Sequence, residues 1–290
     1  MTSAGTAALP IVLALISAFL FALSDHLANR GLASADARGG AVVSVVASAA
    51  AFWCVAPFVV HAGWFATGAA LVFAAIGLFR PALSIWLSLI GIRRLGPTLA
   101  SAFSSTTPIW GGLLAVALLG ERLTPPIAVG TLAVVAGAVL AGWTRKGVPR
   151  QWPLWAIAFP VGAAIIRSIG HVATKYGFGE LPQPFFASLL ATTVSAGVLT
   201  AAFYGRGQRL GSLERYRWFI AGGTINGLSI YSLNTALEQG SVVTVLPISS
   251  SVPVFTLLLG WLVFRRETIG WRTVATIALI VPGIVLVALR

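Results

Sequence analysis

Ten apolar segments, each close to the length that crosses a bilayer, follow one another with only short polar connections between them. A hydrocarbon core of about 30 Å requires roughly 20 helical residues, and the period-two alternation of a transmembrane β-barrel is absent from the sequence. We therefore predict an all-α integral membrane protein with ten transmembrane helices. Their predicted extents are residues 8–29, 39–61, 66–91, 97–119, 124–144, 152–175, 184–204, 216–237, 241–264 and 269–289.

The charged residues are few and lie mainly between the apolar segments. They make up 9% of the chain, against about 25% in soluble domains. The net charge of +12 forms no continuous basic face, so we expect no nucleic-acid partner and take the lipid bilayer as the surrounding partner. One set of alternate connections holds 14 Lys and Arg residues, whereas the other set and the termini hold 3. The positive-inside rule then predicts a bacterial inner-membrane protein with both termini periplasmic.

The two halves of the sequence resemble each other. At a shift of 144–146 residues, the run Leu83–Trp86 meets Leu228–Tyr231, Pro108 meets Pro253, Glu121 meets Glu267 and Gly137 meets Gly283. Each half has five predicted helices, an odd number, so the second half must cross the membrane upside down. We predict two inverted five-helix repeats, residues 1–146 and 147–290. In this architecture the substrate site lies near the membrane midplane between the repeats.

Several chemistries are excluded by missing motifs. The sequence has no G-x-x-x-x-G-K-[ST] loop for ATP phosphates, no G-x-S-x-G elbow and no H-E-x-x-H motif. One cysteine, Cys54, and three scattered histidines make no metal set, and Cys54 reads as a small hydrophobic residue. We therefore predict no metal, no cofactor and no enzyme activity.

The residues that close each half carry a family resemblance. The run Leu118–Thr124 reads LLGERLT and continues through Gly130 to Ala136-Gly137, and the second half keeps FRRET at 264–268 followed by Pro282-Gly283. This pattern resembles the ten-helix EamA-type branch of the drug/metabolite transporter superfamily, over essentially the whole chain. Within the branch it most resembles the YddG-type exporters of aromatic amino acids. The resemblance implies export of amino acids or related metabolites by a secondary mechanism.

Arg80 lies inside the predicted helix 66–91, and an arginine at membrane depth costs at least about 2.5 kcal/mol. Three interpretations are open: a substrate cavity or gate, a structural tie to a carbonyl or carboxylate, and snorkelling to the membrane surface. Ser84 follows one turn later on the same helix stripe, so it is a cavity candidate with Arg80. Pro81 frees a carbonyl one turn back and marks a candidate kink.

Aromatic and amide side chains give further candidates on either side of the repeat alignment. Trp86 and its counterpart Tyr231 could stack on a flat apolar substrate or pack within the protein, and Trp110 is open to the same two interpretations. Asn226 and Ser229 share one face of the helix 216–237. They could bind a ligand or a neighbouring helix.

Two runs of small hydroxyl residues precede the matching prolines. Ser104 stands in the run before Pro108, and Ser250 in the run before Pro253. Single hydroxyls of this kind often bond the preceding turn of their own helix. Their symmetric placement before a proline predicts two helices that bend, line the pathway and act as hinges.

The first helix of each half adds charged candidates. Asp25 aligns with His171, and Phe21 with Arg167, at a shift of 146. Asp25 could relay protons, or it could pair with a neighbour because it lies near the end of its helix. Arg167 and His171 form a deeper cationic spot that suits a carboxylate.

Together these observations predict a secondary transporter that works as a monomer, by alternating access, on small-molecule substrates. We expect export of amino acids, aromatic ones preferred, and related metabolites. The alternative is an exchanger of anionic metabolites such as sugar phosphates or nucleotide sugars, for which Arg80 and Arg167 would be the binding charges.

Overall fold

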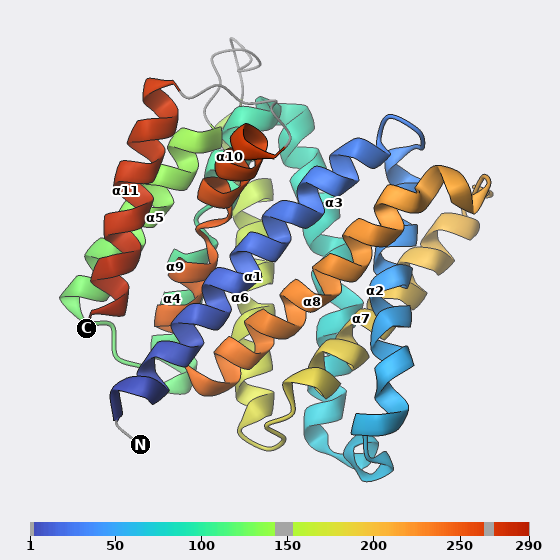
Figure 1. Ribbon diagram of the computed structural model, residues 1–290, viewed down its shortest axis with the longest axis horizontal. Coiled ribbons are helices and arrows are strands. Elements are labelled where there is room, and N and C mark those ends of the chain that lie inside the picture. Colours follow the sequence, from blue (N-terminus) through green and yellow to red (C-terminus); the bar gives the residue numbers. More distant parts are fainter. Residues whose placement is uncertain (1–2, 143–152, 264–269, 290) are drawn as a thin grey trace.

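The structure is a computed structural model that describes residues 3–142, 153–263 and 270–289. Within these residues it consists of helices and short connections, with no strand (Figure 1). The helices are α1 (Ser3–Gly31), α2 (Ala37–Val59), α3 (Gly68–Ser104), α4 (Thr107–Leu119), α5 (Pro125–Gly142), α6 (Ala158–Phe178), α7 (Pro184–Tyr204), α8 (Arg217–Gln239), α9 (Val242–Ser249), α10 (Val252–Leu262) and α11 (Trp271–Ala288), with single 3₁₀ turns at Ala62–Ala66, Leu154–Ile157 and Leu213–Tyr216.

Eight of the described segments are long and apolar enough to cross a membrane. The other two crossings of the ten-helix fold are the first part of α3 and α8. Among the described residues of α3, Gly68–Arg80 form a shorter apolar helix. α8 carries Asn226, Ser229 and Asn234 within its length, and it can hold them because it is covered by α1, α2 and α7. The all-α, ten-helix prediction is confirmed.

The boundary between the third and fourth crossings differs from the prediction. The sequence predicts a joint at Arg93–Gly96, but α3 stays helical for 37 residues, through Pro97. At 1.5 Å per residue this is about 55 Å, longer than one crossing of the bilayer. α3 therefore contains the third crossing and the start of the fourth, and the predicted joint is wrong. Proline removes only one hydrogen bond, which is not enough here to end the helix.

Both hydroxyl–proline runs interrupt a helix. Residues 97–119 divide between α3 and α4 at Ser105–Thr106, and residues 241–264 divide between α9 and α10 at Ser250–Ser251. Pro108 and Pro253 stand in the first turns of α4 and α10, where a missing N–H costs least. The hydroxyls before them bond their own backbone: Thr106 donates to the Phe103 carbonyl at 2.6 Å.

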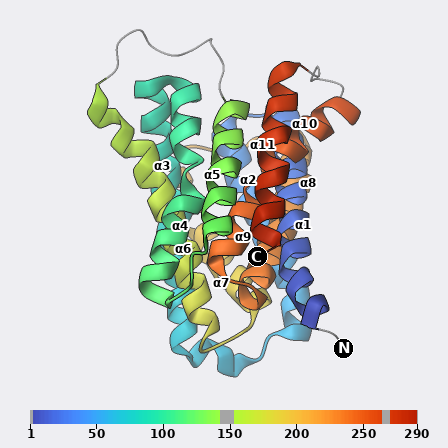
Figure 2. The same ribbon diagram turned by 90° about the vertical axis from the view of Figure 1, so that its left-hand side faces the viewer.

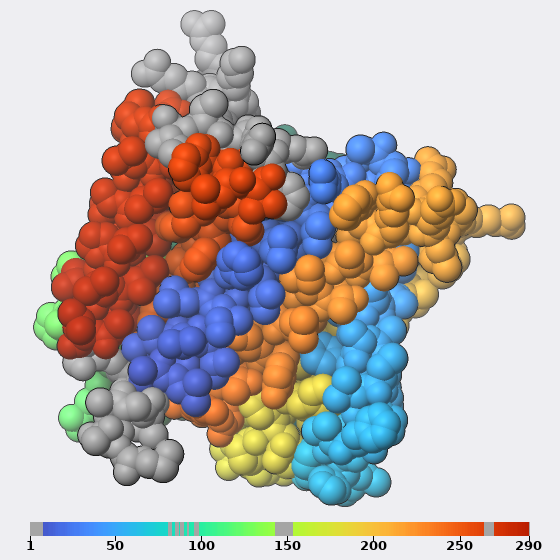
Figure 3. All heavy atoms as spheres, in the orientation of Figure 1, coloured from blue at the N-terminus to red at the C-terminus, as the bar shows by residue number. Residues whose placement is uncertain are grey.

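The helix packing repeats itself when the two halves are exchanged. α1 packs on α8 as α6 packs on α3, and α2 packs on α8 as α7 packs on α3. Figure 3 shows α1 and α8 side by side across one face. α5 and α11 pack on each other (Figure 2) and run in opposite directions, and both chain ends lie toward the lower side of Figure 1. The two repeats are therefore inverted about a pseudo-twofold axis.

Glycines allow the closest of these approaches. A Cβ atom on Gly223 of α8 would overlap the backbone of Ser44 in α2. A Cβ atom on Gly77 of α3 would overlap the backbone of Ala191 in α7. The two glycines are 146 residues apart, so the same close crossing occurs once in each half. Helices in a bilayer associate through such small residues because their backbones can then touch.

At the upper end in Figure 1, the connection after α1 is tied to the start of α8. The Asp36 carboxylate accepts hydrogen bonds from the Gly39 N–H at 2.7 Å and from the Tyr216 hydroxyl at 3.0 Å. These bonds, the Gly39 N–H first, hold the pKa of Asp36 below its ordinary value. Ser34 and Arg215 exchange two further bonds beside them.

At the opposite end, Glu121 joins the two halves. Gly120 ends α4 in the left-handed conformation, with φ of 67°, which a glycine adopts without strain. Glu121 then accepts hydrogen bonds from the N–H groups of Val242 and Val243 at 2.8 and 2.9 Å, in the first turn of α9. A carboxylate at a helix N-terminus satisfies donors that the helix itself cannot. The Gly-Glu pair of the first half is therefore a cap on a helix of the second half.

We expect Glu121→Ala to lower the thermal unfolding temperature in detergent. Loss of a helix cap costs about 0.5–2 kcal/mol, and here two N–H groups lose their acceptor at once. Glu121→Gln keeps one acceptor oxygen and should fall between wild type and alanine. Glu214→Ala, at an exposed residue of the Leu213–Tyr216 turn, is the matched control and should leave the unfolding temperature unchanged. Equal unfolding temperatures for Glu121→Ala and Glu214→Ala would contradict the cap.

Candidate functional site

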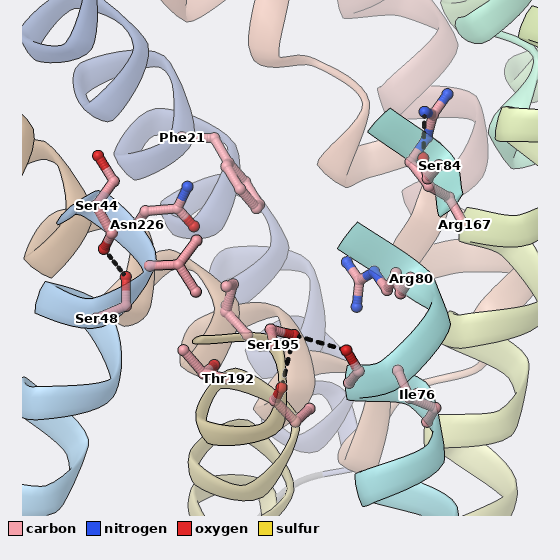
Figure 4. A pocket seen from close by; sticks show the side chains of 14 residues that line it. Phe21, Ser44, Ser48, Ile76, Arg80, Ser84, Arg167, Thr192, Ser195 and Asn226 are labelled. Carbon is pink, nitrogen blue, oxygen red and sulfur yellow. Dashed lines mark hydrogen bonds between the residues drawn. The ribbon is translucent and has the colours of Figure 1, made fainter. Parts of the chain in front are cut away.

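A central cavity of about 410 Å³ lies between α1, α2, α3, α6, α7 and α8 (Figure 4). These six helices enclose it with small, hydroxyl and aliphatic side chains, two arginines, one asparagine and one phenylalanine. The lining residues are Phe21, Ser44, Val45, Ser48, Ile76, Gly77, Arg80, Ser84, Arg167, Ala191, Thr192, Ser195, Asn226 and Ile230.

Most of this lining consists of residues at equivalent positions of the two repeats. Six pairs are separated by 146 or 147 residues: Phe21 with Arg167, Ser44 with Ala191, Val45 with Thr192, Ser48 with Ser195, Arg80 with Asn226, and Ser84 with Ile230. A cavity lined by both members of each pair lies on the axis that relates the halves. This is the position that inverted-repeat transporters use for their substrates.

Arg167 is held in place by neutral oxygens. Its guanidinium donates to the Ser84 hydroxyl at 3.1 Å, to the Ser104 carbonyl at 3.1 Å, and to the Thr107 hydroxyl at 3.3 and 3.4 Å. These bonds orient the side chain of Arg167, and none of the four acceptors is charged.

Arg80 faces the same cavity with fewer contacts. Within the described part of the chain it has no hydrogen-bond or ion-pair partner, and the cavity lining there contains no carboxylate. Two positive charges in a membrane interior without an acid are costly. An anionic ligand that enters the cavity would offset this cost.

The cavity has two chemically different ends. In Figure 4, Arg80, Arg167 and Ser84 lie on the side of α3 and α6, whereas Phe21, Asn226, Ser44 and Ser48 lie on the opposite side. The first end suits a carboxylate or phosphate oxygen, and the second offers one aromatic ring and neutral polar groups. The arrangement fits a small amphiphilic anion.

A second cavity of about 460 Å³ lies beside the two hydroxyl–proline breaks, and we call it the vestibule. Arg167 borders it as well as the central cavity. The predicted residues Ser104, Pro108, Ser250 and Pro253 all line the vestibule and not the central cavity. Its complete lining is Ser101, Ser104, Ser105, Thr107, Pro108, Ala138, Ala141, Gly142, Arg167, Ser250, Val252, Pro253, Thr256 and Leu257.

Of the other predicted residues, Ser229 and Tyr231 lie outside both cavities. Ser229 is fully buried and exchanges hydrogen bonds with Ser17 of α1, so it joins two helices. Tyr231 is 38% exposed and packs edge-on against Phe185, 6.0 Å between ring centroids, in a separate apolar groove. Trp110 donates its indole N–H to Thr106, at the start of its own helix.

His171 and Asp25 occupy contrasting environments. His171 is 6% exposed, within electrostatic range of Arg80 and Arg167, and its Nδ1 has no hydrogen-bond partner in the described residues. Asp25 is exposed on α1, next to His26, whose ring contacts the Thr256 carbonyl at 2.9 Å. Asp25 lines neither cavity. The side chains of Pro81 and Trp86 lie outside the described ones, although α3 is helical at both positions.

The sequence analysis missed three serines of the cavity wall, Ser44, Ser48 and Ser195. Ser195 of α7 donates to the Gly77 carbonyl of α3 at 3.1 Å, and Ser48 of α2 donates to the Gly223 carbonyl of α8. Each bond joins the two helices at one of the close crossings described above. Extending the repeat alignment to α2 and α7, where the shift becomes 147, would have paired Ser48 with Ser195.

Comparison with known proteins gives a family and a fold. The family model described as "EamA-like transporter family" matches twice, at residues 8–143 and 154–289. No curated protein matches the chain. A solved structure titled "Crystal structure of protein" aligns with a TM-score of 0.77 and 18% identity, over 97% of this chain and 96% of that one. At this identity the alignment supports the fold alone.

Proposed function

We propose, on the premise that the chain belongs to the EamA-like transporter family, that it exports amino acids, with aromatic ones preferred. The observation that carries the proposal is the central cavity, with Arg80 and Arg167 at one end and Phe21 at the other. In this proposal the α-carboxylate meets the arginines and the apolar side chain lies toward Phe21, Val45 and Ile230. The volume of about 410 Å³ is in the range of small-molecule sites, about 300–1,000 Å³.

The ammonium group of an amino acid needs acceptors near the carboxylate. The hydroxyls of Thr192 and Ser195 are among the neutral acceptors of the lining. A zwitterion would bring one negative charge to the arginines and would bind with its ammonium group turned toward these oxygens. Asp25 lies away from the cavity, so its proposed part in coupling would be indirect.

A second candidate is exchange of dianionic metabolites such as sugar phosphates or nucleotide sugars. It is favoured by a specific observation: the described cavity lining has two guanidinium groups and no acid. A phosphate monoester has about two negative charges and three acceptor oxygens at neutral pH. Such a group would balance the positive charges of both arginines, whereas a carboxylate would balance only one of them.

The membrane setting completes the proposal. The transporter would lie in a bacterial inner membrane and work as a monomer, with its repeats, residues 1–146 and 147–290, rocking about the central cavity. Arg30 and Arg38 lie in the helix turns that flank the connection after α1, and the connection after α7 carries Arg206, Arg209 and Arg215. They lie at the upper end in Figure 1 and the termini lie lower. By the positive-inside rule, the upper end would then face the cytoplasm and both termini the periplasm.

Uptake into proteoliposomes tests the substrate class. We expect saturable flux of labelled phenylalanine and tryptophan, each competing with the other. Tryptamine, which lacks the carboxylate but keeps the ring, should compete at least tenfold less well. Phosphate-ester exchange without flux of either aromatic amino acid would overturn the first proposal in favour of the second. Competition by tryptamine equal to that by tryptophan would contradict a role for the arginines in recognition.

A further inference from the structure

We propose that the vestibule is a second binding station for the anionic group of the substrate, and that Arg167 passes this group between the vestibule and the central cavity. The inference rests on the proposed function only in taking the transported solute to be an anion or a zwitterion. It assigns a separate site, with its own residues, to the space beside the two helix breaks.

The position of Arg167 is the first support. One guanidinium nitrogen bonds Ser84 in the wall of the central cavity, and another bonds the Ser104 carbonyl and Thr107 in the wall of the vestibule. The same charge is therefore presented to both spaces. Because its partners in the described part of the chain are neutral oxygens, a ligand can replace either set without leaving an acid there unpaired.

The helix breaks supply the second support. The vestibule lining includes Thr107 and Pro108, the first two residues of α4, and Val252 and Pro253, the first two residues of α10. Pro108 and Pro253 have no N–H, and the N–H groups of Ile109 and Val254 already bond the carbonyls of Thr106 and Ser251. The contribution of these ends is therefore the helix dipole, which makes the N-terminal end of a helix positive. Two such ends at one cavity wall, with Arg167 beside them, give the vestibule the electrostatic character of an anion site.

The hydroxyls of the vestibule are donors that can turn from their present backbone acceptors toward a ligand. Ser105, Ser250 and Thr256 each donate to a carbonyl one turn back in its own helix, at 2.9–3.0 Å. Such carbonyls already accept a helix hydrogen bond, so rotation of the hydroxyl toward a ligand oxygen costs little. A carboxylate or phosphate in the vestibule would then gain several neutral donors in addition to Arg167.

The order of the two stations follows from their positions. Gly142, the last residue of α5, lines the vestibule, and α5 ends at the upper, basic end of the bundle in Figure 1. Arg80 lines the central cavity and does not line the vestibule, whereas Arg167 lines both. In an exporter oriented by the positive-inside rule, the anionic group would meet Arg167 first, from the cytoplasm, and Arg80 second.

Thiol labelling tests the vestibule without measuring transport. In a Cys54→Ala background, which has no other cysteine, single substitutions Ser250→Cys and Ser212→Cys place a thiol in the vestibule and on an exposed connection. Each purified protein is treated with the anionic sulfonatoethyl and the cationic trimethylammonioethyl methanethiosulfonates. We expect the ratio of anionic to cationic rates at position 250 to exceed the ratio at position 212 at least tenfold.

Further variants identify the charge that is responsible. Arg167→Gln should lower the anionic-to-cationic rate ratio at position 250 to the value at position 212. Arg167→Lys should restore most of the difference between the two positions. Arg80→Gln should leave most of this difference unchanged. Benzoate or inorganic phosphate, as probe anions, should slow the anionic reagent at position 250. Equal ratios at the two positions, a ratio that Arg167→Gln leaves unchanged, or no protection by either anion would overturn the proposal, whatever the flux assay shows.

Discussion

Replacing Arg80 with glutamine should raise the KM for phenylalanine uptake at least tenfold while the protein stays folded. A hydrogen bond to a charged group contributes about 1.5–3 kcal/mol, and 1.4 kcal/mol corresponds to a factor of ten. The fold should tolerate the change because, within the described residues, Arg80 makes no bond that the glutamine would lose. Proteoliposome uptake across a range of phenylalanine concentrations measures the effect.

Variants of Arg167 distinguish an effect on substrate binding from an effect on the stability of the fold. Arg167→Gln should also raise KM, and in addition it should lower the unfolding temperature because Ser84, Thr107 and the Ser104 carbonyl lose their donor. Arg80→Lys should recover more uptake than Arg80→Gln. Arg209→Gln, at an exposed connection, is the control and should match wild type in both measurements. An unchanged KM in Arg80→Gln would exclude the central cavity as the carboxylate site.

The second large effect concerns the crossing of α2 and α8. Gly223→Ala adds one methyl group that would overlap the Ser44 backbone, and a backbone cannot turn aside as a side chain can. Overpacking of this kind costs about 1–3 kcal/mol, occasionally more. The two helices would also lose the hydrogen bond between Ser48 and the Gly223 carbonyl. We expect a clear fall in the unfolding temperature and in the yield of monodisperse protein.

A matched substitution makes the comparison strict. Gly197→Ala in α7 adds the same methyl group where no neighbouring atom lies within 4 Å. Because alanine is a better helix residue than glycine by about 0.5–1 kcal/mol, this variant should be as stable as wild type or slightly more stable. Gly77→Ala, the repeat equivalent of Gly223→Ala, should behave like the latter. If Gly223→Ala and Gly197→Ala unfold at the same temperature, the crossing is not as close as described.

The sequence was sufficient to predict the helices and the inverted repeat, and it singled out the two arginines that line the central cavity. These features depend on composition, on the spacing of apolar segments and on the cost of a buried charge, all of which are local. The joint at Arg93–Gly96 was predicted wrongly because arginine, glycine and proline together resemble a turn, whereas the helix continues through them.

The cavity lining could be predicted only in part, because it depends on the rotation of each helix. The repeat alignment used a shift of 145 over residues 83–86, which pairs Ser84 with Ser229 and Trp86 with Tyr231. In the cavity the equivalent of Ser84 is Ile230, at a shift of 146. One residue rotates a side chain by about 100° around a helix of 3.6 residues per turn. That rotation moves Ser229 to the interface with α1 and Tyr231 to an outer groove.

The unequal pairs on the pseudo-twofold axis bear on the direction of transport. If the two halves were chemically identical, exchanging their conformations would present the same cavity to each side of the membrane. Here Phe21 is the equivalent of Arg167, and Asn226 the equivalent of Arg80. Both guanidinium groups consequently lie on one side of the axis. In the proposed exporter, a bound anion would meet different surroundings when the cavity faced inward and when it faced outward. The unequal pairs would then give transport a polarity that a fully symmetric duplication would cancel.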